Sequence, residues 1–178
     1  FQQKGVPVLG VEPAGNVAAV AIEKGIPSTV AFFGVSTAEK LVGDGVKADL
    51  LLGNNVLAHV PDIKDFVAGM KIILADAGTI TMEFPHLLKL MMFNQFDTIY
   101  HEHFSYFSLH TVRDIFAAHG LTVFDIDEIS THGGSLRIYA QHTEQKPTQC
   151  KLMTKVLQHE KDAGLCSIET YTQFQKNV

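Results

Sequence analysis

The sequence lacks the features that mark disulfide-rich, membrane-spanning and nucleic-acid-binding proteins. It has only two cysteines, Cys150 and Cys166, which lie 16 positions apart without a CxxC pair, so neither a disulfide scaffold nor a zinc finger is indicated. No apolar run approaches the length of a membrane span, and no signal peptide opens the chain. The 14 basic residues form no stripe and are outnumbered by 19 acidic residues. A membrane or a nucleic-acid backbone is therefore not expected as a partner.

What is present is the composition of an ordinary globular domain. The chain has 178 residues, of which 46% are apolar and 19% are charged, close to the averages for soluble proteins. This length suits one domain with a substantial core, and we expect a soluble, cytoplasmic α/β protein. Residues 1–5 read like the last turn of a helix followed by a glycine, without an initiator Met. We therefore also expect a fragment of a longer protein.

Short apolar runs alternate with helical patterns along most of the chain, which predicts βαβ units and a largely parallel sheet. Strands are expected at 6–13, 28–33, 48–52, 79–84, 121–129 and 136–142, with a turn at Ala77-Gly78. Helices are expected at 16–24, 62–74, 86–93 and 111–119, and from Ser36, where Ser36 and Glu39 have the spacing of a capping box.

The last two expected strands are joined by only a few residues between Ile129 and Leu136. A parallel crossover needs a dozen or more residues, so this pair is predicted to be an antiparallel hairpin. One reversed strand at the C-terminal end of an otherwise parallel sheet is the class I methyltransferase pattern, whereas an NAD-binding Rossmann sheet is all parallel. We place the sheet domain at 1–145 and expect one or two amphipathic helices at 146–178, as a linker or the start of a further domain.

Several candidate residues lie at the carboxyl ends of the expected strands. Open α/β sheets bind their ligands at these ends. Glu12, with Pro13 behind it, ends the first strand and suits the ribose hydroxyls of a nucleoside cofactor, although it cannot separate S-adenosylmethionine from NAD. Phe33 ends the next strand and either flanks an adenine or belongs to the core. Asn54 and Asn55 follow the third strand beside a glycine, where amides suit the amino-acid end of a cofactor.

The densest group of titratable side chains is the segment 100–103, Tyr-His-Glu-His. A histidine titrates near neutrality, and a neighbouring carboxylate such as Glu102 can orient it, which suits general acid–base catalysis. His59 lies four residues past Asn55 and is expected to face the same crevice as that residue. Two alternatives stay open. One is a zinc site that uses His101 and His103, although the sequence has no second HxH motif or Cys pair to complete it. The other is a plain polar loop.

A glycine pair follows His132 in the hairpin connection, and Arg137 lies close behind it. This segment is either an ordinary turn or a contact for an anionic or polar ligand. We list His132, Gly133 and Arg137 as candidate substrate-binding residues.

Taken together, these motifs resemble the sugar C-methyltransferase family. The resemblance covers residues 6 to 142 and depends on Val11-Glu12-Pro13, the Asn-Asn-Val-Leu-Ala-His-Val segment 54–60, the segment 96–104 with its Tyr-x-Glu-His core, Phe107-Ser108 and His132-Gly133-Gly134. It implies an enzyme that uses S-adenosylmethionine to methylate a carbon of a nucleotide-linked deoxy-keto-sugar. It also implies a zinc-binding N-terminal domain and a second Rossmann-like C-terminal domain, neither of which these residues supply.

The resemblance also implies roles for the candidate residues. Glu12 would bind the ribose, and Asn54 and Asn55 would line the methionine end of the cofactor. His103, braced by Glu102, would remove a proton next to the ketone. Tyr100 or His59 would hydrogen-bond the oxygen on which negative charge develops.

Three further questions stay open from the sequence. One alternative function is an NAD-dependent nucleotide-sugar oxidoreductase, and another is a non-catalytic binding module. No metal is expected in this chain itself, and whether it forms a homo-oligomer through exposed sheet edges is not decided.

Overall fold

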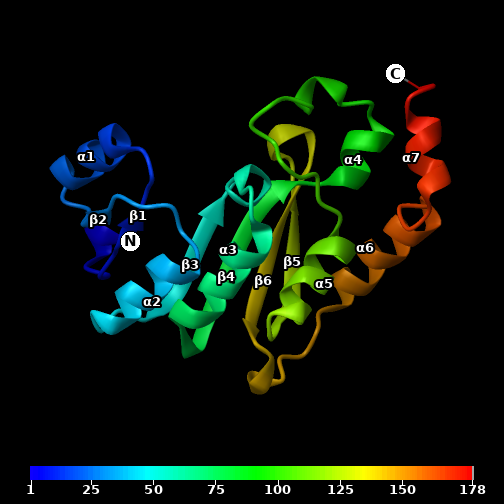
Figure 1. Cartoon of the computed structure of the whole chain (residues 1–178). Helices are drawn as coiled ribbons and strands as arrows, with labels where there is room; N and C mark the ends of the chain where they lie inside the picture. Colours follow the sequence, from blue (N-terminus) through cyan, green and yellow to red (C-terminus); the bar gives the residue numbers. More distant parts are fainter. Residues whose placement is uncertain (178) are drawn as a thin grey trace.

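The computed structural model describes residues 1–177 and shows an α/β arrangement (Figure 1). Two short parallel strands, β1 (Gly10–Val11) and β2 (Ser28–Thr29), pair with each other beside helix α1 (Gly15–Glu23) at the N-terminal end of the molecule. The larger sheet has four strands in the order β3-β4-β6-β5. Its strands are β3 (Ala48–Asn54), β4 (Leu74–Pro85), β5 (Leu121–Ile129) and β6 (Ser135–His142).

Strand direction confirms the predicted fold class. β3 and β4 are parallel, whereas β6 is antiparallel to both β4 and β5. The β5–β6 hairpin was predicted from the short connection, because a parallel crossover does not fit within it. An all-parallel NAD-binding sheet is thereby excluded for this part of the chain.

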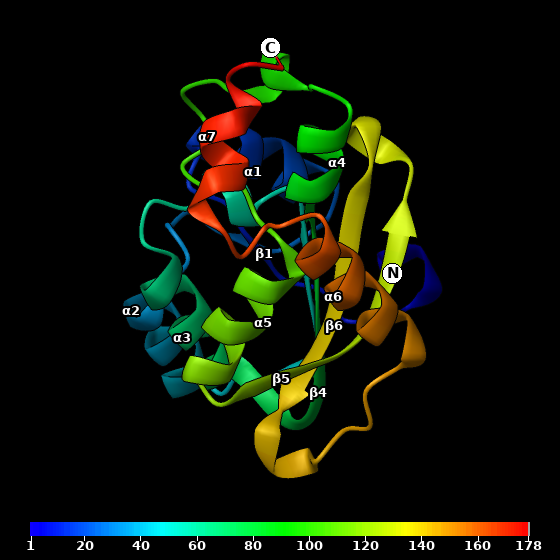
Figure 2. The same ribbon diagram turned by 90° about the vertical axis from the view of Figure 1, so that its right-hand side faces the viewer.

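The main core lies between the four-stranded sheet and the helices packed on one of its faces. Helices α5 and α6 lie side by side against β5 (Figure 2). Inward-facing residues of β4 and β6, including Ile80, Met82, Phe84 and Ile138, are fully buried. The remaining elements are α2 (Val35–Gly43), α3 (Ile63–Ile73), α4 (Leu87–Met92), α5 (Leu109–Ala118), α6 (Lys151–Asp162), α7 (Ile168–Phe174) and the 3₁₀ turns at Gln2–Lys4, Leu57–His59, Phe96–Thr98, Thr131–Gly133 and Thr143–Gln145.

Hydrogen bonds to aspartate side chains explain where two of the helices begin. The Asp62 side chain accepts the backbone N–H groups of Lys64 and Asp65, at 3.1 and 3.0 Å, as the predicted N-cap of α3. The predicted capping box at Ser36 is wrong. Helix α2 already begins at Val35, whose N–H donates to Asp65 Oδ1 at 3.2 Å, so a side chain from α3 replaces the local cap.

The expected turn at Ala77-Gly78 is also wrong, because β4 continues through it. Ala48 pairs with Leu74, yet Leu50 pairs with Thr79, so β4 carries extra residues opposite β3 at this point. The extra residues form an irregularity within the strand instead of ending it. A Cβ at Gly78 would come within 2.7 Å of the Ala48 carbonyl oxygen, which explains the glycine there.

The first two strands are much shorter than the predicted 6–13 and 28–33. Within the described residues each pairs with the other alone, over two residues. A strand that has one partner gains fewer ladder hydrogen bonds and less burial to offset the cost of ordering it.

The C-terminal segment forms two helices, as predicted, and α6 belongs to the core. Met153 and Val156 of α6 are buried in the same cluster as the sheet residues. None of the helices in residues 1–177 combines the length and apolar character that crossing a bilayer requires.

Candidate functional site

Two histidines from different parts of the chain meet at the carboxyl end of β3 and β4. His59 ends the 3₁₀ turn that follows β3, and His103 lies in the loop between α4 and α5. Their ring centroids are 4.8 Å apart. Backbone hydrogen bonds fix this approach, because the N–H groups of Phe104 and Ser105 both donate to the Ala58 carbonyl. The predicted convergence of His59 with the 100–103 segment is therefore present.

The hydrogen bonding of His103 determines which ring nitrogen carries a proton in the neutral form. Its Nδ1 lies 2.9 Å from the backbone carbonyl oxygen of Thr98. A carbonyl can only accept, so Nδ1 must be the donor and Nε2 carries the lone pair. Nε2 is buried and has no partner among the described residues. A buried, unpaired acceptor of this kind is suited to take a proton from a ligand.

His59 has the same type of arrangement. Its Nδ1 lies 3.0 Å from the backbone carbonyl oxygen of Glu102 and must donate to it. The Nε2 atom of neutral His59 is then an acceptor. His59 could therefore stabilise a developing oxyanion only in its protonated, imidazolium form. When both histidines are neutral, the hydroxyl of Tyr100 is the available donor; its ring centroid lies 4.3 Å from that of His103.

The expected bracing of His103 by the Glu102 carboxylate is not what the structure shows. Glu102 is exposed, and its backbone carbonyl, not its side chain, enters the network through His59. The brace on His103 is the Thr98 carbonyl. Adjacency in the sequence does not make two side chains contact each other, and here the Glu102 side chain is exposed while the His103 ring bonds to Thr98.

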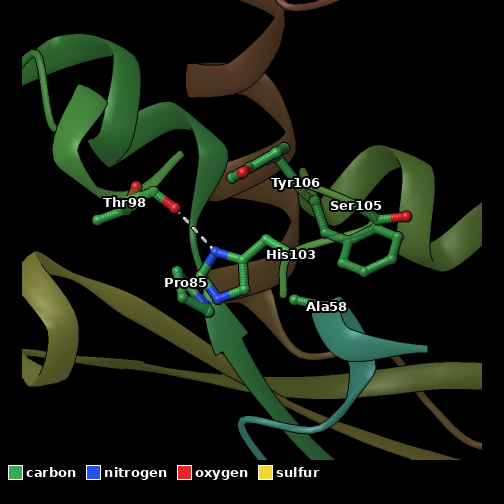
Figure 3. A pocket seen from close by; sticks show the side chains of 7 residues that line it. Ala58, Pro85, Thr98, His103, Ser105 and Tyr106 are labelled. Atoms are coloured by element: carbon green, nitrogen blue, oxygen red, sulfur yellow. Dashed lines mark hydrogen bonds between the residues drawn. The ribbon is translucent and has the colours of Figure 1, made fainter. Parts of the chain in front are cut away.

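A small pocket borders His103 (Figure 3). In this view the imidazole lies below Tyr106 and above Pro85 and Ala58. The residues that line the pocket are Ala58, Pro85, Thr98, His103, Ser105, Tyr106 and Phe107. The sequence reasoning missed Tyr106, whose ring lies edge-on to His103 with centroids 5.7 Å apart. The signal was its place in the aromatic-rich segment 100–107, which also contains Tyr100.

Asn54 and Asn55 lie at the end of β3, as predicted. Asn55 has a left-handed backbone (φ 54°), and its N–H donates to the Glu83 carbonyl at 2.9 Å. Its side-chain oxygen Oδ1 is buried without a partner among the described residues. Such an acceptor is costly unless a donor reaches it, so Asn55 fits the ammonium or amide end of a ligand.

Glu12 and Pro13 lie between β1 and α1, beside the separate two-stranded sheet (Figure 1). Glu12 is half-buried, and its Oε1 accepts the Ala14 N–H at 2.8 Å; Oε2 has no partner among the described residues. Pro13 is exposed. Phe33 packs edge-on against Phe66 with ring centroids 5.3 Å apart and belongs to the core, which favours the core alternative over contact with an adenine.

The Arg137 guanidinium is occupied by an acid that the sequence reasoning missed. Arg137 Nη2 donates to Glu83 Oε2 at 2.9 Å, and the Thr131 hydroxyl donates to Glu83 Oε1 at 3.0 Å. The hydrogen bond that Arg137 donates to Glu83 raises the pKa of Arg137, with a smaller contribution from Tyr139. Glu83 lies two residues before the end of β4, and an acid near the end of an expected strand is the signal that could have identified it. Arg137 thus ties β6 to Glu83 of β4, and its contact with a substrate stays a prediction.

His132 and Gly133 lie in the 3₁₀ turn of the same loop. His132 is exposed and has a left-handed backbone (φ 51°). The Gly133 carbonyl accepts a hydrogen bond from Gln95 at 2.9 Å, which ties this loop to the segment before the Tyr-x-Glu-His run. Contact of these two residues with a substrate stays a prediction. Within residues 1–177, no three His, Cys, Asp or Glu side chains cluster as a metal site would require.

A parallel sheet with one reversed strand next to its edge, and with polar side chains gathered at the carboxyl ends of its strands, defines a class I methyltransferase fold. A family model described as a methyltransferase domain matches residues 1–126. The chain belongs to this methyltransferase domain family. A second model, described as a C-methyltransferase C-terminal domain, matches residues 130–178.

Comparison with individual proteins agrees with this assignment. C-methyltransferase NovU of Streptomyces niveus is 37% identical over 174 residues, which are 98% of this chain and 41% of NovU. The chain thus spans about two fifths of the length of this curated relative.

Among solved structures, an S-adenosylmethionine-dependent methyltransferase from Anabaena variabilis has a TM-score of 0.62 at 11% identity, covering 80% of this chain and 71% of that one. Magnesium protoporphyrin IX methyltransferase from Synechocystis, with S-adenosylhomocysteine bound, has a TM-score of 0.59 at 16% identity, covering 78% of this chain and 65% of that one. These similarities show the fold.

Proposed function

We propose that this chain is the catalytic part of an S-adenosylmethionine-dependent C-methyltransferase that acts on a nucleotide-linked deoxy-keto-sugar. The methyltransferase family match and the 37% identity to NovU support methyl transfer to carbon. The keto-sugar substrate follows from the family resemblance of the sequence motifs. The observation that carries the proposal is the buried, unpaired Nε2 of His103, since carbon must lose a proton before it is methylated.

The residues present fit S-adenosylmethionine. Glu12 has a carboxylate oxygen free for ribose hydroxyls, and Asn55 presents the unpaired acceptor that an α-ammonium group would satisfy. Asn54, at the same strand end, would line this part of the cofactor. When bound, the cofactor supplies an electrophilic methyl group on a sulfonium sulfur.

In the proposed mechanism this chain's residues activate the substrate carbon. A ketone acidifies the neighbouring C–H, and the Nε2 lone pair of His103 accepts that proton. The Thr98 carbonyl holds the Nδ1 proton and so stabilises the imidazolium that forms. The hydroxyl of Tyr100 donates to the enolate oxygen; a group in that role contributes on the order of 3 kcal/mol.

The test compares two neighbouring histidines in the protein that contains this chain. We expect His103→Gln to lower methyl transfer to a nucleotide-linked keto-sugar roughly 10²–10⁴-fold, the usual contribution of a general base. His101→Gln is the matched control, since His101 is exposed and lies two positions away. Its rate should stay within about twofold of wild type.

A second readout isolates the proton transfer. With S-adenosylhomocysteine in place of the methyl donor, the wild-type protein should exchange the substrate C–H for deuterium from D₂O, and His103→Gln should not. Wild-type rates of both exchange and methyl transfer in this variant would refute the base assignment. If calorimetry detected no binding of S-adenosylhomocysteine to the protein, the non-catalytic alternative would replace the proposal.

A further inference from the structure

One buried carboxylate from helix α6 contacts the segments that frame the candidate site. The side chain of Glu160 is 1% exposed. Its Oε1 accepts the Leu109 N–H at 2.6 Å and lies 2.7 Å from His86 Nε2, and its Oε2 accepts the His110 N–H at 2.9 Å. A buried carboxylate is tolerated only when hydrogen bonds compensate it, and these three donors do so.

Two of these donors lie at the start of α5, next to the loop of the candidate site. Leu109 and His110 form the first turn of α5 and directly follow the loop that carries His103 and lines the pocket. Their N–H groups are among those that a helix leaves unpaired at its start, and a negative charge there is also favoured by the helix dipole. Glu160 therefore fixes the point at which the site loop ends.

His86 connects the same carboxylate to the sheet. It directly follows the pocket residue Pro85 at the end of β4, and its backbone N–H donates to the Gly134 carbonyl at 3.0 Å. The next N–H, of Leu87, donates to the Phe107 carbonyl at 2.9 Å. His86 Nδ1 is buried without a partner in the described part of the chain. The orientation of this imidazole thus depends on its bond to Glu160.

No uncharged side chain can make all three contacts. A glutamine has one oxygen and one NH₂ group, so at least one of the two backbone N–H groups of α5 would face another donor. We propose that Glu160 is a positioning residue for methyl transfer. By capping α5 and holding His86, it makes the geometry of the His103 loop dependent on the docking of α6. The inference relies on the proposed role of His103 for its kinetic readout alone.

The experiment compares Glu160→Gln with Asp162→Asn in the full protein. Both variants remove one carboxylate from α6, but Asp162 is exposed and bonds only to Gln158 in the described contacts. We expect kcat to fall roughly tenfold or more in Glu160→Gln, since a displacement of about 1 Å at a reacting group can cost up to ~100-fold. The Kd for S-adenosylhomocysteine should stay within twofold, because its candidate ligands lie at the ends of β1 and β3, and Glu160 bonds to neither segment. Asp162→Asn should leave both quantities unchanged.

A spectroscopic readout separates positioning from loss of stability. In ¹⁵N NMR spectra, wild-type His103 should show a single tautomer with its proton on Nδ1, and Glu160→Gln should show a mixture of both tautomers. A lower urea midpoint with an unchanged His103 signature and unchanged kcat per folded molecule would overturn the proposal. This result is independent of catalysis, so a failure of His103→Gln to affect activity would refute the proposed function and leave this inference intact.

If Glu160→Gln does not fold, hydrogen exchange of the wild-type protein gives the answer. Segments that depend on one another open with the same free energy and the same denaturant dependence. The amides of Leu109 and His110 should then open together with those of α6. If α6 opens at lower free energy while these two amides stay protected, the site loop does not depend on α6 and the proposal is wrong.

Discussion

At the scale of single residues, backbone carbonyls and buried acids control the candidate site. Both site histidines donate Nδ1–H to a carbonyl oxygen, of Thr98 for His103 and of Glu102 for His59. This arrangement leaves two Nε2 lone pairs in a small region without assistance from a neighbouring carboxylate. Glu83, in turn, ties Arg137 and Thr131 to the end of β4. Charge at this edge therefore holds the loop between β5 and β6.

A surface ion pair gives a prediction for the pH dependence of stability. Lys71 Nζ donates to both carboxylate oxygens of Glu144, at 3.1 and 2.9 Å, and this bond lowers the pKa of Glu144 below its ordinary value of 4.5. A depressed folded-state pKa stabilises the fold above the ordinary value and ceases to do so as the pH falls through the folded-state pKa. Glu144→Gln should therefore lower the urea midpoint slightly at pH 7 and by less at pH 3.

The control for this pair is Glu39→Gln, which removes an exposed carboxylate of α2 that makes no ion pair among the described residues. Its urea midpoint should match wild type at both pH values. Because the pair is exposed, 1 M NaCl should also shrink the Glu144→Gln effect. An effect that persists unchanged at pH 3 would mean that the carboxylate acts by packing instead of charge.

At the scale of secondary structure elements, close approach between helices decides which glycines are required. Gly69 lies in the middle of α3, where glycine is normally unfavourable by about 1 kcal/mol relative to alanine. A Cβ at this position would lie 2.6 Å from the carbonyl carbon and 2.7 Å from the carbonyl oxygen of Gly34, the residue before α2. The glycine therefore allows the start of α2 to pack on α3.

We predict that Gly69→Ala destabilises the protein by about 1–3 kcal/mol, in spite of the better helix propensity of alanine, because the clash is with backbone. Gly43→Ala is the matched control, since a Cβ there meets nothing within 4 Å in the last residue of α2. This variant should be neutral or slightly stabilising, by at most ~1 kcal/mol. Urea unfolding measures both, and equal stability of the two variants would contradict the packing argument.

At the scale of the whole molecule, the two groups of strands differ in how much they bury. The four-stranded sheet contributes most of the main core, and β4 pairs along both of its edges. The N-terminal unit of β1, α1 and β2 has one buried apolar residue, Ala18, and leaves Val17, Val20 and Ile22 of α1 about half-exposed. Local stability should follow this difference, since opening the N-terminal unit uncovers little apolar surface.

We predict that native-state hydrogen exchange is many-fold faster in residues 10–30 than in β4 and β6. The amides of Ile80, Met82 and Ile138 should exchange through global unfolding, whereas those of α1 should exchange through local opening. Addition of S-adenosylhomocysteine to the protein should slow exchange near Glu12 if that residue binds the ribose. Equal protection of both parts would contradict the prediction.

The sequence by itself determined the order and type of most elements, because they depend on local patterns. The β5–β6 hairpin followed from the length of its connection, and the start of α3 from Asp62. The family resemblance placed His59 and His103 around one substrate, and their rings do lie 4.8 Å apart. The sequence-based predictions were wrong at the start of α2, where the capping side chain comes from another helix. They were also wrong in β4, where the glycine expected to form a turn lies within the strand that pairs with β3.

The tertiary structure alone decided the hydrogen-bond partners of the site. A backbone carbonyl such as that of Thr98 has no signature in the sequence, so the brace on His103 was assigned to the adjacent Glu102. The pairing of Glu83 with Arg137 joins residues 54 positions apart, and that of Glu160 with His86 joins residues 74 apart. Local patterns report which side chains are available, but contacts between distant segments form only when the chain has packed, and those contacts set the state of each group.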